Sequence, residues 1–180
     1  MYDLKLSKYL SYILRHQPQS GNIVLDSEGW ASIENVIHGY KAGKMAISKK
    51  AILLVVEHNP KKRFEVNETQ THIRAVQGHS KELGINIEMK EFIPESEVFH
   101  GTIETRVSSI LENGLNSGNR NHVHLSKDKE TAINVGQRHG KPVLLKIDAR
   151  KMRADGYKLL ESKNGVILID FVPPQYISRA

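Results

Sequence analysis

Apolar residues occur in this chain only in short runs. The longest unbroken run, residues 51–56, is six residues long, whereas a helix that crosses a bilayer needs about 20. We therefore expect no membrane span, and a fold built from short helices and strands. Hydrophobic residues form 39% of the 180 residues. That share is enough for one soluble domain or two small lobes, and it excludes global disorder.

The first 60 residues show the spacing of amphipathic helices. Apolar residues recur every three and four positions between 6 and 14, which predicts one helix, and a proline follows shortly after it. Two further short helices are expected over 33–37 and 51–57, with Ser32 and Ser48 as their N-caps.

Strand signals accompany these helices. A short strand is expected at 23–25, with Trp30 as a core anchor beyond the next turn. Residues 63–66 and 72–76, separated by a polar turn, predict a β-hairpin. Three helices followed by a hairpin are the element order of a winged-helix module.

The pattern changes near residues 90–97, which are charged and contain a proline. We place a lobe boundary there, giving lobes of residues 1–92 and 93–180. The second lobe is expected to be mixed α and β, so the fold class is α+β. Its expected strands are 98–100, 122–126, 143–147 and 166–169, and its expected helices are 107–111, ended by Gly114, and a second one capped by Ser126 and running to 139.

Charge and cysteine content limit the partners and the catalytic groups that the chain can have. The net charge is +6 and is shared equally by the two halves, which favours an anionic partner such as nucleic acid or a phosphorylated ligand. With no cysteine, the chain has no disulfide, no thiol nucleophile and no thiolate metal site. The N-terminus lacks a secretory signal pattern, so cytoplasmic residence is the expectation.

Basic residues in the first half could bind phosphate. Arg15 and His16 lie at the expected end of the first helix, where a cation can hold an anion while the imidazole moves a proton. Arg63 and Arg74 belong to the two strands of the hairpin, and converging guanidinium groups bind phosphate bidentately. The alternatives are helix-terminal surface residues and a solvated basic run.

Two segments could approach a ligand through a glycine. In residues 73–80, Gly78 would let the backbone come close to a ligand, although a strand with a polar turn explains the segment as well. In residues 100–102, Gly101 would let a flat ligand such as a nicotinamide ring lie on the backbone, whose amide and carbonyl can pair with the carboxamide.

Residues 120–126 form the strongest local pattern of the second half. His122, His124 and Ser126 project from one strand face at period two, with Arg120 directed the same way. Paired imidazoles can bind zinc, but no nearby cysteine or aspartate completes a tetrahedral set, so no metal is expected. The chain also lacks a GxGxxG motif and a P-loop.

Taken together, these motifs resemble the RNA 2′-phosphotransferase family in order and spacing over nearly the whole chain. The segments that carry the resemblance are 6–16, 62–65, 73–80, 100–102, 120–126, 164–166 and 172–174. The resemblance implies a winged-helix RNA lobe followed by an NAD-binding lobe of the ADP-ribosyltransferase type, with the active site in the cleft between them.

The family removes an internal 2′-phosphate from RNA and consumes NAD. In the first step the 2′-phosphate attacks the anomeric carbon of the nicotinamide ribose and expels nicotinamide, leaving an ADP-ribosylated RNA phosphate. In the second step the ribose 2″-hydroxyl attacks phosphorus, which frees the RNA 2′-hydroxyl and forms ADP-ribose 1″,2″-cyclic phosphate.

The resemblance also assigns residues to roles. The catalytic set is Arg15, His16, Arg63 and Arg120; the NAD site is His100, Gly101, Thr102, His124 and Ser126; the RNA-binding residues are Arg74, Gln77 and His79. The role of His16, proton transfer or phosphate contact in the second step, stays open. The place of His122 depends on the strand register.

One departure from related transferases bears on the reaction. Many protein-modifying ADP-ribosyltransferases carry a glutamate on a late strand, whereas residues 164–168 here contain no carboxylate. The substrate phosphate is then expected to act as the nucleophile.

The expected enzyme is a monomer that needs no protein partner. The alternatives are an ADP-ribosyltransferase that caps terminal nucleic-acid phosphates and a winged-helix regulator without turnover.

Overall fold

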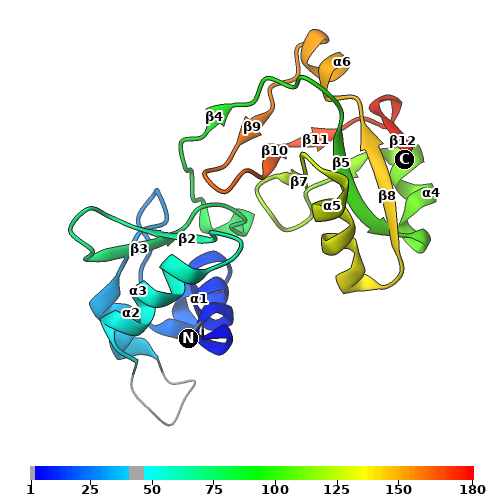
Figure 1. The fold of residues 1–180 in the computed structure, drawn as a ribbon. Coiled ribbons are helices and arrows are strands. Elements are labelled where there is room, and N and C mark those ends of the chain that lie inside the picture. Colours follow the sequence, from blue (N-terminus) through cyan, green and yellow to red (C-terminus); the bar gives the residue numbers. More distant parts are fainter. Residues whose placement is uncertain (1–2, 41–46) are drawn as a thin grey trace. The chain divides into compact units, whose positions relative to one another are not determined.

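A computed structural model of the chain describes residues 3–40 and 47–180, and these form two compact units, Met1–Glu88 and Met89–Ala180 (Figure 1). Each unit has a hydrophobic core of its own. The division between them falls four residues before the expected boundary, because β4 (Lys90–Glu91) pairs with β9 (Leu160–Glu161) in the second unit. Both units combine helices with antiparallel sheets, so the chain is α+β.

The first unit contains the three predicted helices and the predicted hairpin. The helices are α1 (Leu4–Arg15), α2 (Ile33–Gly39) and α3 (Lys49–His58); the sheet has the order β1 (Ala31–Ser32), β3 (His72–Ala75), β2 (Phe64–Val66); short 3-10 helices cover Pro18–Gly21 and Lys81–Leu83. Ser32 and Ser48 cap α2 and α3 as expected, by accepting from Asn35 N and Ala51 N.

Residues 23–25 are not a strand, so that prediction is wrong. Ile23 is buried in the core, but its backbone amide donates to the Pro18 carbonyl instead of to a neighbouring strand. The Asp26 side chain accepts from Glu28 N and Trp30 N. This turn reverses the chain, and it is β1, just after it, that pairs with β3.

The core of the first unit gathers around one face of α1. Leu6, Leu10, Ile13 and Leu14 are fully buried, as the helical spacing requires, whereas Leu4 on the same helix is 56% exposed. Burying a leucine side chain stabilises the fold by about 1.5–3 kcal/mol relative to leaving it in water.

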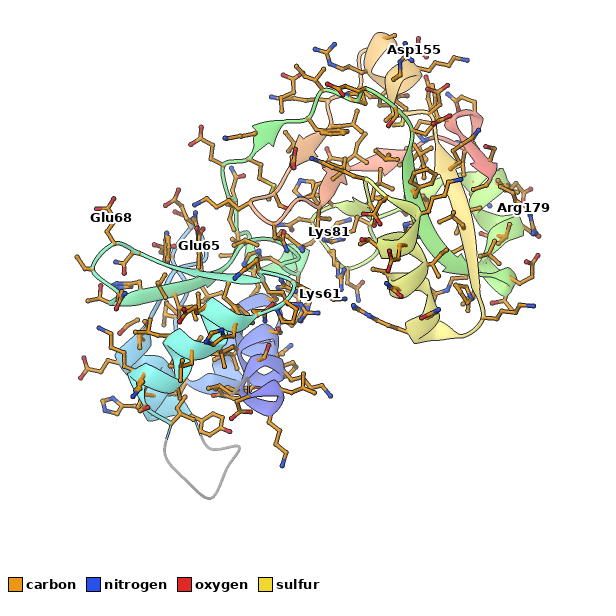
Figure 2. All side chains as sticks on the ribbon, in the orientation of Figure 1. Lys61, Glu65, Glu68, Lys81, Asp155 and Arg179 are labelled. Carbon is orange, nitrogen blue, oxygen red and sulfur yellow. The ribbon has the colours of Figure 1, made fainter. Side chains whose placement is uncertain are left out.

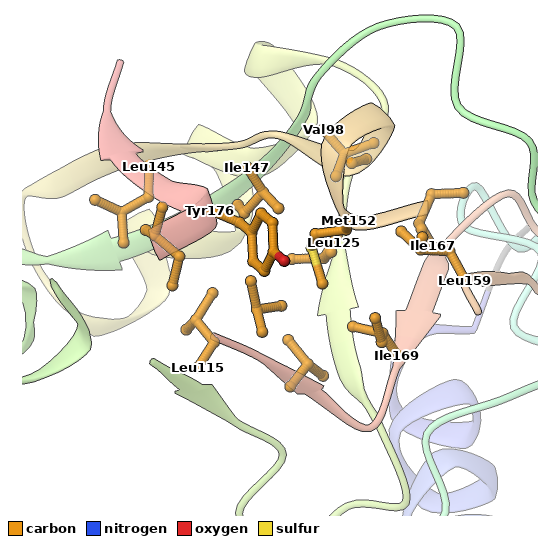
Figure 3. Close-up of a cluster of buried hydrophobic side chains, with 14 of the residues drawn as sticks. Val98, Leu115, Leu125, Leu145, Ile147, Met152, Leu159, Ile167, Ile169 and Tyr176 are labelled. Carbon is orange, nitrogen blue, oxygen red and sulfur yellow. The ribbon is translucent and has the colours of Figure 1, made fainter. Parts of the chain in front are cut away.

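The second unit consists of three antiparallel sheets. Their orders are β12 (Ile177–Arg179), β8 (Pro142–Ile147), β5 (Val98–Ile103); β4, β9, β10 (Ile167–Ile169), β7 (Val123–Leu125); and β11 (Phe171–Val172), β6 (Leu115–Asn116). Its helices are α4 (Glu104–Asn113), α5 (Lys129–Gly136) and α6 (Ala149–Ala154), with 3-10 helices at Gln137–His139 and Pro174–Tyr176. Val98, Leu125, Leu145 and Ile167, from four strands, meet in its core (Figure 3).

The cap predicted for α5 is wrong. Asp128, not Ser126, accepts from the Thr131 amide at the start of the helix. Ser126 lies too early in the chain to cap this helix, because α5 begins at Lys129 and Ser126 still pairs with Phe99 in β5 through its backbone N–H and C=O. The other predicted strands and helices of this unit are present, with boundaries shifted by a few residues.

Close packing of α5 on β5 explains Gly101. A Cβ built there would lie 1.8 Å from the Ala132 carbonyl oxygen of α5. No side chain fits at that distance, so only glycine lets the helix approach the strand. No helix in the described part of the chain is long and apolar enough to cross a membrane.

Replacing Leu10 by alanine should lower the free energy of unfolding by about 2–5 kcal/mol, because a cavity forms in the core of the first unit. Leu4→Ala, on the exposed part of the same helix, should change it by less than about 0.5 kcal/mol. Urea unfolding followed by circular dichroism measures both. Equal losses would show that α1 is not packed through this face.

Candidate active site

In the first unit, a polar cluster lies at the C-terminal end of α1. Arg15 is the last helical residue and is 9% exposed, and His16 is the C-cap. The backbone amide of Ser80 donates to the Arg15 carbonyl over 2.8 Å, and the Ser80 hydroxyl lies 2.9 Å from His16 Nδ1. Ser80 is thus bonded to two consecutive residues at the end of α1, from which it is distant in sequence.

Gly78 lies against the Arg15 guanidinium. Its φ angle is +87°, in the region that favours glycine, and a Cβ there would be 3.6 Å from Arg15 Cζ and Nη1. The sequence suggested that Gly78 lets the backbone approach a ligand. In the structure, the group that the Gly78 backbone approaches is a side chain of the protein itself.

His79 is a neutral group inside this cluster. It is 2% exposed, and its Nε2 has no hydrogen-bond partner among the described residues. Burial, and then the charges of Arg15, His16 and Arg74, lower the pKa of His79 to about 4. Its assignment to RNA binding stays a prediction, and its ring is buried within reach of the charges of Arg15, His16 and Arg74.

Arg63 is presented by a tight loop between α3 and β2. The Asn59 side-chain carbonyl accepts from Lys61 N at 3.0 Å and from Arg63 N at 3.4 Å. Asn59 is fully buried and donates from Nδ2 to Ser7 Oγ of α1. Lys62 has a positive φ of 42°, and its ammonium donates to the Glu57 carbonyl at the end of α3.

This loop is a feature that the sequence analysis missed. Asn59 is not among the site residues that the motifs predict. The available signal was an asparagine two residues before a backbone amide that needs an acceptor, the pattern of an Asx turn. The loop fixes the backbone of Arg63, whose carbonyl also accepts from Val76 N. The half-buried Arg63 and residues 76–80 therefore belong to one region of the first unit.

The Arg74 side chain is hydrogen-bonded to other groups of the protein. Its Nε donates to Glu65 Oε1 over 2.6 Å, and Nη1 donates to the Glu28 carbonyl. Glu65 lies directly opposite Arg74 in the hairpin register and is labelled in Figure 2. The guanidinium also lies 4.4 Å from the centre of the Trp30 ring. Arg74 and the buried Gln77 stay predicted RNA-binding residues.

In the second unit, the predicted NAD residues meet where β5 adjoins β7. Within the described residues, a single bridge between Phe99 and Ser126 joins the two strands. Beside it, His100 Nδ1 lies 3.1 Å from the His124 carbonyl oxygen. Because a carbonyl only accepts, Nδ1 carries the proton. Burial lowers the pKa of His100, so the ring is neutral near pH 7 and Nε2 is an acceptor.

The strand geometry leaves the backbone of Gly101 directed away from β8. Phe99 pairs with Ser126 through both its N–H and its C=O, so its polar groups point to the β7 side. Successive residues of an antiparallel strand direct these groups to alternate edges. Gly101 therefore presents its N–H and C=O on the same edge as Phe99, one step beyond the bridge to β7.

The structure of β7 and the residues beside it shows where His122 and His124 lie. Val123 and Leu125 are buried in the core, so His124 belongs to the opposite face of β7, whereas His122 lies in a bend just before the strand. Arg120 Nη1 lies 3.4 Å from His124 Nδ1. His122 instead lies 3.6 Å from the Asp170 carboxylate. The structure thus groups Arg120 with His124, whereas His122 contacts Asp170 instead.

Arg120 lies near a second cation. Partial loss of hydration, and then the charge of Arg138, lower the pKa of Arg120, although a guanidinium stays charged at neutral pH. Two like charges that lie close together favour an anion beside them. Among the described residues there is no group of three or more histidines or carboxylates that could hold a metal ion.

Comparison with known proteins places the chain in a family. Residues 2–171 match the model of the RNA 2′-phosphotransferase, Tpt1 / KptA family, and the chain belongs to this family. A protein of Pseudomonas fluorescens named "Probable RNA 2′-phosphotransferase" is 48% identical over 95% of this chain and 93% of its own length. Proteins of the same name from Acaryochloris marina and Fusobacterium nucleatum are 45% and 43% identical, over 95% and 97% of this chain and 93% and 97% of their own lengths. The family predicted from the motifs is confirmed.

The depressed pKa of His79 predicts a pH-dependent stability. Between pH 6.5, the ordinary pKa, and about pH 4, His79 binds a proton in the unfolded chain but not in the folded one. The free energy of unfolding therefore falls as the pH drops through this window. From pH 7 to 4.5 the folded protein should lose about 2 kcal/mol more than a His79→Gln variant does. Urea unfolding at the two pH values measures this. Parallel losses in both proteins would contradict a buried neutral His79.

Proposed function

We propose that this protein is an NAD-dependent RNA 2′-phosphotransferase, which transfers an internal 2′-phosphate from RNA to NAD and releases nicotinamide and ADP-ribose 1″,2″-cyclic phosphate. The observation that carries the proposal is the family match, which spans both units and every residue of the candidate site. The local geometry of each unit supports it, because each holds groups suited to one of the two substrates.

The groups suited to the phosphate are cations and an imidazole. Arg15, His16 and Arg63 belong to the first unit, and Arg120 to the second. Gly78 packs on the Arg15 guanidinium, Asn59 holds the Arg63 backbone, and His124 contacts Arg120. These contacts would preorganise the cations for a phosphoryl group whose charge shifts during transfer. In this proposal the three arginines stabilise that charge, and His16 acts in the second step.

The groups suited to NAD lie on β5 and β7. The Gly101 N–H and C=O would pair with the nicotinamide carboxamide, and His100 Nε2 would accept from a ribose hydroxyl. The buried Thr102, together with His124 and Ser126, completes the proposed site. Bound NAD would supply an anomeric carbon with nicotinamide as its leaving group. No metal is needed for this chemistry.

The proposal also gives each unit a fold and a role. Three helices and a hairpin-containing sheet support a winged-helix RNA-binding unit. Its hairpin turn is rigid, since Asn67 Oδ1 accepts from both Thr71 N and His72 N. The second unit would be the ADP-ribosyltransferase-like one. We further propose a cytoplasmic monomer that acts on a tRNA-like RNA during splicing.

The turn between β9 and β10 supports the proposed nucleophile. Ser162 Oγ donates to Asn164 Oδ1, and Ser162 N bonds the Val166 carbonyl, so the turn is closed by its own polar groups. Because residues 164–168 contain no carboxylate, no general base from this turn would activate an acceptor. An RNA phosphate needs none, as it is already an anion.

The test is an RNA carrying one internal 2′-phosphate, incubated with the protein with and without NAD. We expect loss of the phosphate only with NAD, accompanied by nicotinamide release. A persistent ADP-ribosylated RNA would favour an ADP-ribosyltransferase that modifies nucleic-acid phosphates and stops after the first step. Binding of the RNA without either product would favour a winged-helix regulator.

Arg120→Ala should lower the rate of this reaction more than tenfold, because it removes one preorganised charge from the developing phosphoryl group. Arg150→Ala, which removes an exposed arginine on α6, is the matched control and should leave the rate unchanged. Single-turnover assays with both variants measure the effect. Full activity of Arg120→Ala would remove Arg120 from the catalytic set.

A further inference from the structure

We propose that one exposed face of α1 binds the single-stranded RNA that flanks the 2′-phosphate. Lys5, Lys8 and Tyr12 form this face, which we call the α1 face. The two ammonium groups contact the phosphates of the strand, and the Tyr12 ring stacks on a base near the modified nucleotide. The inference rests on the proposed function, because it names the surface that holds the RNA on either side of the reacting phosphate.

The first argument is the position of these side chains on the helix. Lys5, Lys8 and Tyr12 are spaced by three and four residues, and all three are exposed. His16, a predicted catalytic residue, follows four residues after Tyr12, and its amide donates to the Tyr12 carbonyl over 2.9 Å. Side chains with this spacing lie along one side of a helix. The α1 face therefore ends at the cluster that holds Arg15 and His16.

The second argument is the charge of this part of the chain. Residues 4–25 contain no aspartate or glutamate. In the described part of the first unit, α2 and α3 each contain a glutamate, whereas α1 contains only basic and uncharged residues. Asp3 is the N-cap, and its side chain accepts from Leu6 N at the end of the helix away from His16. Basic side chains without carboxylates between them attract the phosphates of a nucleic acid.

The third argument is the exposed aromatic ring. Tyr9, the other tyrosine of α1, packs edge-on against Tyr40 with ring centres 4.8 Å apart, and its hydroxyl donates to the Gly39 carbonyl. Tyr12 instead is 47% exposed. Proteins bind single-stranded nucleic acid with such rings, which stack on bases while nearby cations contact the phosphates. Because every base has a face that can stack, this contact suits a strand of any sequence.

A comparison with α3 favours α1 as the RNA-binding helix. In a helix-turn-helix module, the second helix is the one that normally enters a groove of the nucleic acid. Here residues 51–56 in the middle of α3 are all apolar, and Ile52 and Val55 among them are buried. The lysines of α3, Lys49 and Lys50, belong to its first turn only. α3 thus offers few groups to bases or phosphates along its length.

The length of the α1 face predicts how much RNA it contacts. Lys5 and His16 are eleven residues apart, which is about 16 Å along a helix. A stacked nucleotide occupies about 3.4 Å of a strand, so the face spans several nucleotides. A dinucleotide bound at its 2′-phosphate would therefore not reach both lysines, whereas a longer strand would. RNA length thus distinguishes the α1 face from the phosphate site itself.

The test measures RNA binding without the reaction. Fluorescence anisotropy in the absence of NAD gives the Kd of a single strand of about 12 nucleotides with one internal 2′-phosphate, and of a dinucleotide with the same phosphate. Tyr12→Ala should weaken binding of the longer RNA about fivefold or more, and Tyr12→Phe, which keeps the ring, should not. Lys8→Ala should also weaken it and should lower the slope of log Kd against log salt concentration by about one. Binding of the dinucleotide should stay the same.

A matched control removes a lysine from another helix. Lys50→Ala, on the exposed first turn of α3, should leave the Kd of both RNAs unchanged. Because Lys8 and Tyr12 are exposed, their variants should unfold at the same urea concentration as the wild type. A change in RNA binding without a change in this midpoint shows that the side chain contacts the RNA.

Three outcomes separate this inference from the proposed function. Wild-type binding of the longer RNA by Tyr12→Ala and Lys8→Ala would overturn the α1 face alone. Equal weakening of the dinucleotide and the longer RNA would also overturn it, because the residues would then act at the 2′-phosphate. If the RNA binding depends on both residues but the wild-type protein with NAD leaves the phosphate in place, the proposed function is wrong and the α1 face stands as an RNA-binding surface.

Discussion

The hydrogen bond from the Ser80 amide to the Arg15 carbonyl is the contact on which the candidate site of the first unit depends. It joins the end of α1 to the segment that leaves the hairpin, two parts of the chain that local structure alone would not bring together. The Arg15 guanidinium then lies on Gly78, and His16 meets the Ser80 hydroxyl. The buried face of α1 fixes the helix, and this bond fixes what the helix end presents.

Burial lowers the pKa of one histidine in each unit. His79 and His100 both have a lowered pKa because they are removed from water. A neutral His79 adds no further positive charge to the region that holds Arg15 and Arg74. A neutral His100, held at Nδ1 by a carbonyl, keeps an acceptor at Nε2. Both histidines are therefore neutral near pH 7.

Local patterns predicted the helices, the hairpin and the family, because capping serines and apolar spacing act over a few residues. They failed where a tertiary contact decided the outcome. Residues 23–25 form no strand, and Ser126 pairs with β5 while Asp128 caps α5. The site shows the same limit. The motifs singled out His16 and residues 73–80, but only the fold shows that Ser80 contacts His16, and that Asn59 holds the Arg63 loop.

The central claim is that the RNA phosphate itself is the nucleophile and ends on the ribose of NAD. The most direct measurement uses RNA whose 2′-phosphate carries oxygen-18 at every non-bridging position, with mass spectrometry of the products. The account predicts ADP-ribose cyclic phosphate that keeps all of the label, together with unlabelled RNA 2′-hydroxyl. Labelled inorganic phosphate with intact NAD would contradict it, because water would then have removed the phosphate.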